Sequence, residues 1–319
     1  MFVIDIFGFS RGAAQARALV NEIHRLSNSN SYYWGGTRIQ VRYLGLFDTV
    51  GSVGMPGDDD DTNFLVNDDL SGEISLSIHP SAVQNAVHLT AYDERRDYFP
   101  VTSLKSESGG LASNFIEEVL PGVHSDIGGG YGPVVDKVYF QKNKISTVGR
   151  MLEDKIEIIK SELMAKTAAE FPYYQIDKIE VEQEYLGDNI YKYVFQPVSY
   201  REVGHELSHS ALHIMYEYAL KFGVPLEPLE NLPNKPAKYE YKIPNKMRNL
   251  LDQIKQEGFD SIAHFHLNRW YIHHSNQYGA KPGDLLNPHL EDTDAEHTAE
   301  NGQREQFFNQ LSEAVEPEN

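Results

Sequence analysis

The sequence predicts an α/β fold, on the basis of apolar runs that end in turns and one helical stripe between the first two of them. Apolar runs predict strands at residues 2–7, 39–47, 86–92 and 115–120. Between the first two runs, apolar side chains recur at helical spacing and form one stripe, made of Ala16, Leu19, Val20, Ile23 and Leu26. Strands joined by helices are typical of a parallel sheet covered on both faces.

The first strand leads into a tight turn. Residues 8–12, Gly-Phe-Ser-Arg-Gly, fit the pattern Gly-x-Ser-x-Gly of a strand-to-helix elbow that exposes a serine hydroxyl. We expect the strand to be buried on both faces, and side chains at Gly8 and Gly12 to collide with their neighbours. A helix starting after Ser10 would point its N–H groups at a developing oxyanion. The pattern therefore predicts Ser10 as a nucleophile, with an ordinary glycine-rich turn as the alternative.

Composition excludes several classes of protein. The chain has 319 residues, a net charge of −19 and no cysteine. The charge argues against sequence-independent nucleic-acid binding and against electrostatic adsorption to anionic lipid. The absence of cysteine excludes disulfides, and no motif indicates a cofactor. No apolar run approaches the roughly 18 residues of a membrane span, and the N-terminus lacks the features of a signal peptide, so we expect synthesis in the cytoplasm without one.

Two further polar residues follow predicted strands. Asp48 ends the second strand, and His124 lies in the loop 121–131, Pro-Gly-Val-His-Ser-Asp-Ile-Gly-Gly-Gly-Tyr. Strand ends of an open α/β sheet are where ligand sites form. The order Ser10, Asp48, His124 is that of the α/β-hydrolases, in which the imidazole takes the serine proton and the carboxylate orients the imidazole.

Each of these assignments has an alternative. Asp48 could simply cap its turn, and His124 could be a surface histidine without a catalytic task. Asp126 is a rival for the acid, because it lies two residues from His124. His88 lies inside an apolar run, so we expect it to be a hydrogen-bonded core residue.

Three blocks of the chain resemble the type VI secretion lipase effectors, bacterial α/β-hydrolases with fungal relatives. The blocks are 8–17, 47–51 and 121–131, and the similarity is strong over residues 1–131. The resemblance implies phospholipase cleavage of an acyl ester by a triad of Ser10, Asp48 and His124. It also implies a phospholipid substrate, contacts with the secretion apparatus and immunity proteins, and delivery into the periplasm of a target cell.

One feature departs from that family. In such hydrolases several strands precede the nucleophile strand, whereas here the nucleophile strand follows Met1 directly. About 100 residues of sheet are therefore expected to be absent, at about 30 residues per strand-helix unit. They would include the loop that donates a second oxyanion N–H, which leaves mainly the N–H of Arg11. The predicted fold is thus a partial α/β-hydrolase sheet, and a catalytically incomplete fragment, or one half of a split protein, is an alternative.

The rest of the chain predicts a mainly helical cap. We expect a hydrolase core at 1–140, a cap or accessory region at 141–290 and a flexible acidic tail at 291–319. Within the cap, the apolar pattern predicts helices at 142–170 and 203–222, and partial alternation predicts a strand at 264–275.

A second motif offers a different chemistry. Residues 205–209 read His-Glu-Leu-Ser-His, a complete H-E-x-x-H, whose histidines on a helix could bind Zn²⁺ with Glu206 as general base. No convincing third ligand follows: Glu227 and Glu230 lie in a proline-rich turn, and His213 extends the same helix face. A zinc metallopeptidase is therefore the second hypothesis, and an amphipathic helix with half-exposed histidines is the structural alternative.

Overall fold

The structure is a computed structural model that describes residues 1–28, 33–34, 37–51, 75–94, 96, 99–132, 134–140, 142–170, 175–229, 241–273 and 306–307. The chain forms two compact units, one of Met1–Gly132 with Gly204–Asn319 and one of Pro133–Val203. This division differs from the expected boundaries at 140 and 290, because the chain returns to the first unit after residue 203.

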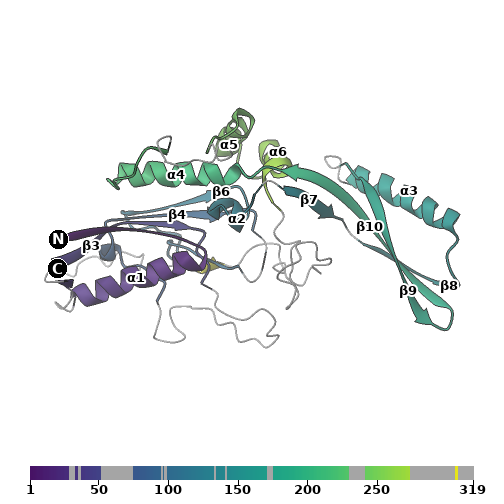
Figure 1. The fold of residues 1–319 in the computed structure, drawn as a ribbon, viewed down its shortest axis with the longest axis horizontal. Coiled ribbons are helices and arrows are strands. Elements are labelled where there is room, and N and C mark those ends of the chain that lie inside the picture. Colours follow the sequence, from purple (N-terminus) through teal and green to yellow (C-terminus); the bar gives the residue numbers. More distant parts are fainter. Residues whose placement is uncertain are drawn as a thin grey trace. The chain divides into compact units, whose positions relative to one another are not determined.

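The first unit is built on a parallel sheet (Figure 1). Its strands are β1 (Phe2–Phe9), β3 (Thr37–Phe47), β4 (Asn85–Ala91) and β6 (Phe115–Leu120), in the order β1-β3-β4-β6 and all parallel. A short β2 (Tyr33–Trp34) pairs antiparallel with the start of β3. The predicted strands are thus confirmed, and their carboxyl ends meet at one edge of the sheet.

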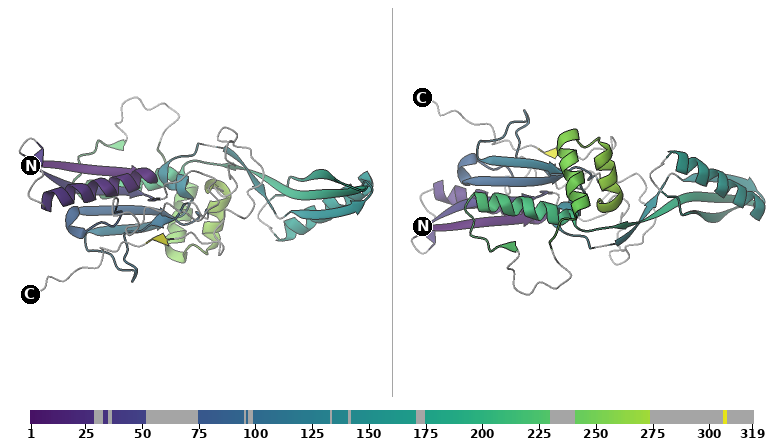
Figure 2. Two further views of the ribbon diagram at one scale, coloured as in Figure 1. Left: turned by 90° about the horizontal axis from the view of Figure 1, so that it is seen from below. Right: turned by 90° about the horizontal axis from the view of Figure 1, so that it is seen from above.

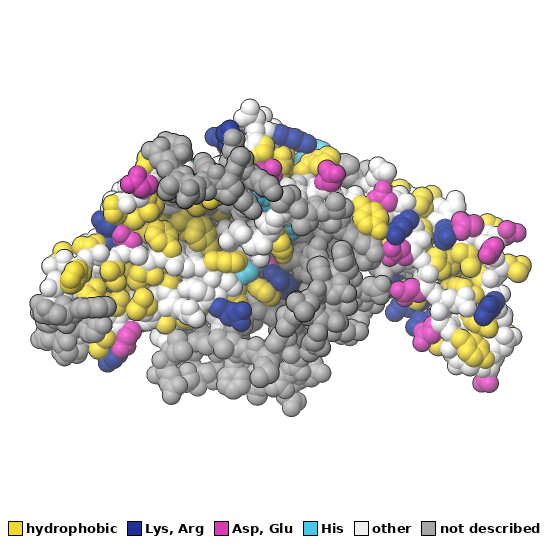
Figure 3. Space-filling model, viewed as in Figure 1, with side chains coloured by type: hydrophobic (Ala, Val, Ile, Leu, Met, Phe, Trp, Pro, Cys, Tyr) yellow, Lys and Arg dark blue, Asp and Glu magenta, His cyan; other side chains and the backbone are white. Residues whose placement is uncertain are grey.

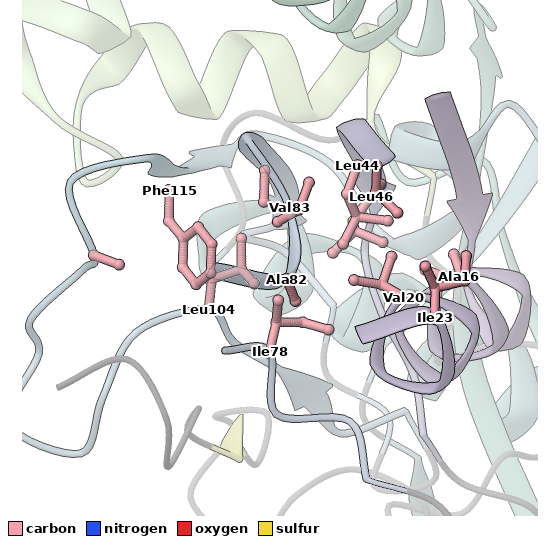
Figure 4. Close-up of a cluster of buried hydrophobic side chains, with 14 of the residues drawn as sticks. Ala16, Val20, Ile23, Leu44, Leu46, Ile78, Ala82, Val83, Leu104 and Phe115 are labelled. Carbon is pink, nitrogen blue, oxygen red and sulfur yellow. The ribbon is translucent and has the colours of Figure 1, made fainter. Parts of the chain in front are cut away.

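Helices cover both faces of this sheet. The helix α1 (Arg11–Asn28) lies on one face and α4 (Leu207–Lys221) on the other, as the views of Figure 2 show. Alternate residues of β3 supply the two cores: Leu44 and Leu46 pack with α1 (Figure 4), whereas Tyr43 packs with Met215 of α4. The predicted amphipathic helix after Ser10 and the predicted helix within 203–222 are therefore confirmed.

The remaining elements of the first unit are short strands, a short turn and three helices, some before and some after the strands of the sheet. A 3-10 turn, η1 (Pro80–Ala82), precedes β4, and β5 (Val101–Thr102) pairs with β11 (Gln306–Phe307). The short helix α2 (His124–Gly128) follows β6, so His124 opens a helix rather than lying on a loop. α5 (Asn245–Glu257) and α6 (Ile262–Tyr271) pack on Val123 through a buried cluster that includes Met247, Ile254, Ala263, Leu267 and Ile272. Of the predicted tail 291–319, the structure describes only β11.

The second unit is an antiparallel sheet with one helix. β10 (Ile190–Val203) pairs with β7 (Val134–Tyr139), β8 (Asn143–Val148) and β9 (Lys178–Gly187). The helix α3 (Glu153–Glu170) covers a core that includes Met151, Ile179, Tyr193 and Phe195. The predicted helix 142–170 is wrong for its first part, which forms β8. There the β-branched Ile145, Thr147 and Val148 favour a strand, and Gly149 ends it with a φ of 77°.

Burial of β1 on both faces is also a wrong prediction. Among the described strands β1 pairs only with β3, so it lies at the edge of the sheet. Phe2, Val3 and Phe7 are consequently exposed, with 53%, 43% and 42% of their surface accessible. Figure 3 shows hydrophobic side chains at the surface of this unit. An apolar run predicts a strand but does not show whether it has one neighbour or two.

The strand predicted at 264–275 is a helix instead. Ser261 caps α6 by accepting a hydrogen bond from the His264 N–H at 3.3 Å. Ala263 and Leu267, four residues apart, are buried on one face, which is helical spacing. Of the helices that the structure describes, none is long and apolar enough to cross a bilayer.

Candidate active site

Ser10 occupies a strained turn between β1 and α1. Its φ is 58°, in the left-handed region that non-glycine residues rarely adopt, as in a tight strand-to-helix turn. The Ser10 N–H donates to the Phe47 carbonyl at 3.0 Å, and the Ser10 carbonyl accepts from the Val50 N–H at 3.4 Å. Within the described part of the chain, all hydrogen bonds of Ser10 are made by its backbone. These bonds hold Ser10 against the residues on either side of Asp48.

The glycines of the elbow differ in their roles. A Cβ at Gly8 would lie 2.4 Å from the Gly12 carbonyl oxygen, so the close approach expected there is confirmed. A Cβ at Gly12 would meet no described atom within 4 Å, so the collision expected at that position does not occur. Arg11 opens α1, and its N–H belongs to the first turn, whose N–H groups have no acceptor within the helix.

Asp48 and His124 contact each other directly. His124 Nδ1 lies 2.6 Å from Asp48 Oδ2, and both side chains are buried. The second oxygen, Oδ1, accepts from the Ala91 N–H at 3.0 Å. Asp48 has a φ of 42° at the end of β3. An Nδ1–H that donates to this carboxylate leaves the lone pair of the neutral imidazole on Nε2.

Two aromatic rings enclose the His124 imidazole. The Phe9 ring centroid lies 4.5 Å from it, and the Phe99 ring meets it edge-on at 5.0 Å. Phe9 precedes Ser10, so this contact places the imidazole beside the elbow. Gly128 makes the packing possible, because a Cβ there would lie 2.1 Å from the Phe9 ring. The structure therefore brings Ser10, Asp48 and His124 together at one sheet edge.

A second buried imidazole, that of His88, lies near Asp48 and bonds the residue that follows it. His88 Nε2 accepts from the Thr49 N–H at 3.0 Å, and Nδ1 donates to Glu117 Oε2 at 2.9 Å. Burial lowers the pKa of His88, in agreement with a neutral ring that can accept the Thr49 proton. Burial raises the pKa of Glu117, but bonds from His88, Ser103 and Leu104 outweigh it and hold the value at about 2. The prediction of His88 as a hydrogen-bonded core residue is confirmed.

Asp126, the rival acid, bonds a different imidazole. Its Oδ1 lies 2.5 Å from His273 Nδ1, and its Oδ2 accepts from the N–H groups of Val123 and His273 at 3.1 Å. Burial raises its pKa against the opposing effect of these bonds. The structure thus pairs His124 with Asp48 rather than with its near neighbour in sequence.

Glu94 is a site residue for which the sequence analysis had no role. It is buried, accepts from the His124 N–H at 3.2 Å, and pairs with Arg96 Nε at 2.9 Å. The Arg96 guanidinium lies 3.5 Å from the centroid of the Phe99 ring. The signal available was the position of the acidic pair Asp93-Glu94 just beyond the end of β4, at the same sheet edge as Asp48.

The H-E-x-x-H segment makes other contacts. His209 Nδ1 lies 3.4 Å from the Lys242 carbonyl, and His213 Nε2 lies 2.6 Å from that of Tyr241. Buried atoms of His205 (Nδ1) and Glu206 (Oε2) have no hydrogen-bond partner in the described structure. Nowhere in the described part of the chain do three His, Asp or Glu side chains gather as a metal site would require.

Five chains of solved structures match this chain, among them the two that follow. The Tle1 effector bound to the VgrG spike of the type VI secretion system matches with a TM-score of 0.61 and 23% identity, over 96% of this chain and 67% of that one. An uncharacterized protein from Pseudomonas aeruginosa gives a TM-score of 0.42 and 23% identity, over 82% of this chain and 29% of that one. None of the curated proteins compared with the chain matches it.

A family model also matches. Residues 25–149 fit the model of the catalytic domain of Tle1-like phospholipase effectors of the type VI secretion system. Asp48 and His124 lie inside the matched segment, and Ser10 precedes it. The resemblance to the type VI secretion phospholipase effectors, expected from three sequence blocks, is therefore confirmed by a family model over residues 25–149 and by the fold.

Proposed function

We propose that this chain is a serine hydrolase that cleaves carboxylic esters of phospholipids, with Ser10, Asp48 and His124 as its triad. The observation that carries the proposal is the 2.6 Å contact between His124 Nδ1 and Asp48 Oδ2, beside a serine held at a φ of 58°. The parallel order of β1, β3, β4 and β6 supports a partial α/β-hydrolase sheet, because it brings the three strand ends to one edge.

Each side chain has one role in the reaction. His124 Nε2 takes the proton of Ser10 Oγ as the oxygen attacks the ester carbonyl carbon, and the N–H of Arg11 stabilises the resulting oxyanion. The imidazolium then gives that proton to the leaving alcohol as the carbon–oxygen bond breaks. Water, activated by the same imidazole, releases the fatty acid and restores Ser10. Asp48 holds the tautomer and stabilises the imidazolium throughout.

The Ser10 hydroxyl becomes aligned for catalysis when the substrate binds. Among the described residues Ser10 Oγ has no hydrogen-bond partner, while the imidazole is already fixed by Asp48 and by two aromatic rings. Catalytic hydrogen bonds often tighten only when substrate binds. The partly exposed Ser10 beside a buried imidazole suits an ester that enters from the surface.

The similarity to the type VI secretion effectors extends the proposal to how this chain is delivered to its target cell. The solved Tle1 effector is bound to the VgrG spike, and we propose a comparable secretion-apparatus partner for this chain. Immunity proteins are further proposed partners, and the periplasm of a target cell is the proposed site of action. The strongly negative net charge, −19, leaves apolar contact as the route to a phospholipid surface.

The test combines a covalent probe with hydrolysis. The full chain is incubated with an alkyl fluorophosphonate, and fatty-acid release from phosphatidylethanolamine vesicles is measured with and without a chelator. We expect labelling and release that Ser10→Ala abolishes and that the chelator leaves unchanged. Labelling retained in Ser10→Ala, or release abolished by the chelator, would contradict the proposal. A wild-type chain that neither reacts nor hydrolyses would support the incomplete-fragment alternative.

A further inference from the structure

Three consecutive backbone N–H groups, those of residues 122, 123 and 124, each donate to a carboxylate. The Gly122 N–H donates to Asp93 at 2.7 Å, the Val123 N–H to Asp126 at 3.1 Å, and the His124 N–H to Glu94 at 3.2 Å. His124, the proposed base, is the first residue of α2, Val123 caps that helix, and Gly122 precedes the cap. Their backbone is therefore fixed by side chains from two different segments.

Each of these carboxylates is in turn held by a nitrogen-bearing side chain. Glu94 pairs with Arg96, two residues away. Asp93 lies 3.1 Å from His264 Nε2, and Asp126 lies 2.5 Å from His273 Nδ1. The two histidines belong to α6 and the residues just after it, about 140 residues further along the chain than His124. We call His264 and His273 the α6 histidines.

Packing fixes the α6 histidines in place. The Tyr131 ring stacks on His273 with centroids 4.2 Å apart, and His273 is only 1% exposed. His264 meets the Tyr92 ring edge-on at 5.4 Å. Ile272, next to His273, is buried in the same cluster as Val123. Apolar contact thus joins α6 to the turn, and the imidazoles bond two of its three carboxylates, those of Asp93 and Asp126.

The turn needs this support because its backbone is unusual. Gly122 has a φ of 121°, and a Cβ there would lie 2.8 Å from Asp126 Cβ. Buried imidazole–carboxylate pairs add little stability beyond that of apolar side chains, but they do fix direction. A displacement of about 1 Å in a catalytic group can cost about 100-fold in rate.

We propose that the α6 histidines are positioning residues, which act through Asp93 and Asp126 to hold the 122–124 backbone so that the His124 imidazole meets Asp48. The inference rests on the proposed function, because it gives His124 the role of base. It makes α6 part of the catalytic apparatus, although α6 contributes no group that touches the substrate.

The test compares two replacements of His273. In His273→Asn the amide can donate to Asp126 from nearly the position of Nδ1, whereas His273→Leu retains bulk and loses the donor. We measure kcat and KM on a soluble p-nitrophenyl ester, together with the proton NMR signal of the His124 Nδ1–H. That signal is identified by its loss in His124→Gln.

We expect His273→Leu to lower kcat about 100-fold with KM unchanged and to shift the His124 signal, and His273→Asn to restore kcat to within about tenfold of wild type. His264→Leu, at a more exposed position, should lower kcat about tenfold. The matched control is His213→Leu, since His213 contacts the Tyr241 carbonyl and not the turn. It should leave kcat and the signal unchanged.

Equal losses in the Leu and Asn variants, or an unchanged signal and kcat in folded His273→Leu, would overturn the proposal. If His273→Leu does not fold, an unchanged kcat and signal in His264→Leu would do the same. Failure of the proposed function is distinguishable, because a wild-type chain without hydrolysis still reports the His124 signal. The shift in that signal then decides the positioning role alone.

Discussion

Two histidine-bearing segments of the first unit, 122–126 and 205–213, contain similar side chains and differ in what those side chains contact. In the first, His124 bonds Asp48, a residue 76 positions away at the end of another strand. In the second, the His209 and His213 rings bond backbone carbonyl groups, and Glu206 meets His209 through its backbone carbonyl, which accepts from the His209 N–H at 3.1 Å. A local spacing can match a metal motif by chance, whereas convergence of strand ends brings distant groups together by construction.

Of the substitutions that test this difference, we expect one at Asp48 to have the largest effect on kcat. Asp48→Asn keeps the shape of the side chain but cannot stabilise the imidazolium, so we expect kcat for ester hydrolysis to fall about 10⁴-fold. The matched control is Asp5→Asn, which removes a carboxylate of β1 that pairs with Arg42 instead. A folded Asp48→Asn chain that retains kcat within tenfold of wild type would show that His124 works without it.

Much of this arrangement could be predicted from the sequence. Strand ends carrying Ser10, Asp48 and His124 are local signals, and parallel pairing then places them at one edge. Partners at long range could not be predicted: the bonds from Asp126 to His273 and from Asp93 to His264 depend on how α6 packs. The exposed edge at β1 was missed because an apolar run does not reveal its number of neighbours.

The second prediction concerns the buried pair behind Asp48. Glu117→Ala removes the carboxylate that accepts from the His88 Nδ1–H, the Ser103 hydroxyl and the Leu104 N–H. We expect the free energy of unfolding to fall by about 3 kcal/mol, measured by urea titration. Glu118→Ala changes the neighbouring glutamate, whose carboxylate bonds Tyr218, and should cost less. Equal losses in the two variants would contradict a special role for the pair.

Acid should weaken the fold through His88. Its pKa is lowered by burial, so the folded state keeps the ring neutral while the unfolded chain takes up a proton below about pH 6.5. Below about pH 6.5 this costs up to about 1.4 kcal/mol per pH unit, until the pH falls through the lowered pKa of the folded ring. The stability that depends on Glu117, with its pKa near 2, is lost only at lower pH.

The difference between wild type and His88→Gln isolates this effect. The glutamine can still accept from the Thr49 N–H but does not titrate, so the unfolding free energy of the variant should fall less steeply as the pH drops below about 6.5. Other titrating groups, including Asp126 with its raised pKa, contribute equally to both proteins. If the unfolding free energies of the two proteins fall in parallel with pH, His88 is not the source of the loss of stability in acid.

The smallest expected effect is in the second histidine segment. Glu206→Gln should leave ester hydrolysis within about twofold of wild type, because Glu206 contacts none of the three proposed triad side chains. Peptidase activity that requires added Zn²⁺ and disappears in Glu206→Gln would instead favour the metallopeptidase hypothesis. His209→Ala should behave in the same way as Glu206→Gln in both assays.

The central claim is that the side chains at the ends of β1, β3 and β6 act on one ester. A crystal structure of the chain after reaction with an alkyl fluorophosphonate tests it most directly. We expect phosphorus bonded to Ser10 Oγ, one phosphoryl oxygen within hydrogen-bond distance of the Arg11 N–H, and His124 Nε2 directed at the adduct with its contact to Asp48 intact. An adduct on another residue, or an imidazole at 124 turned away from Ser10, would contradict the account.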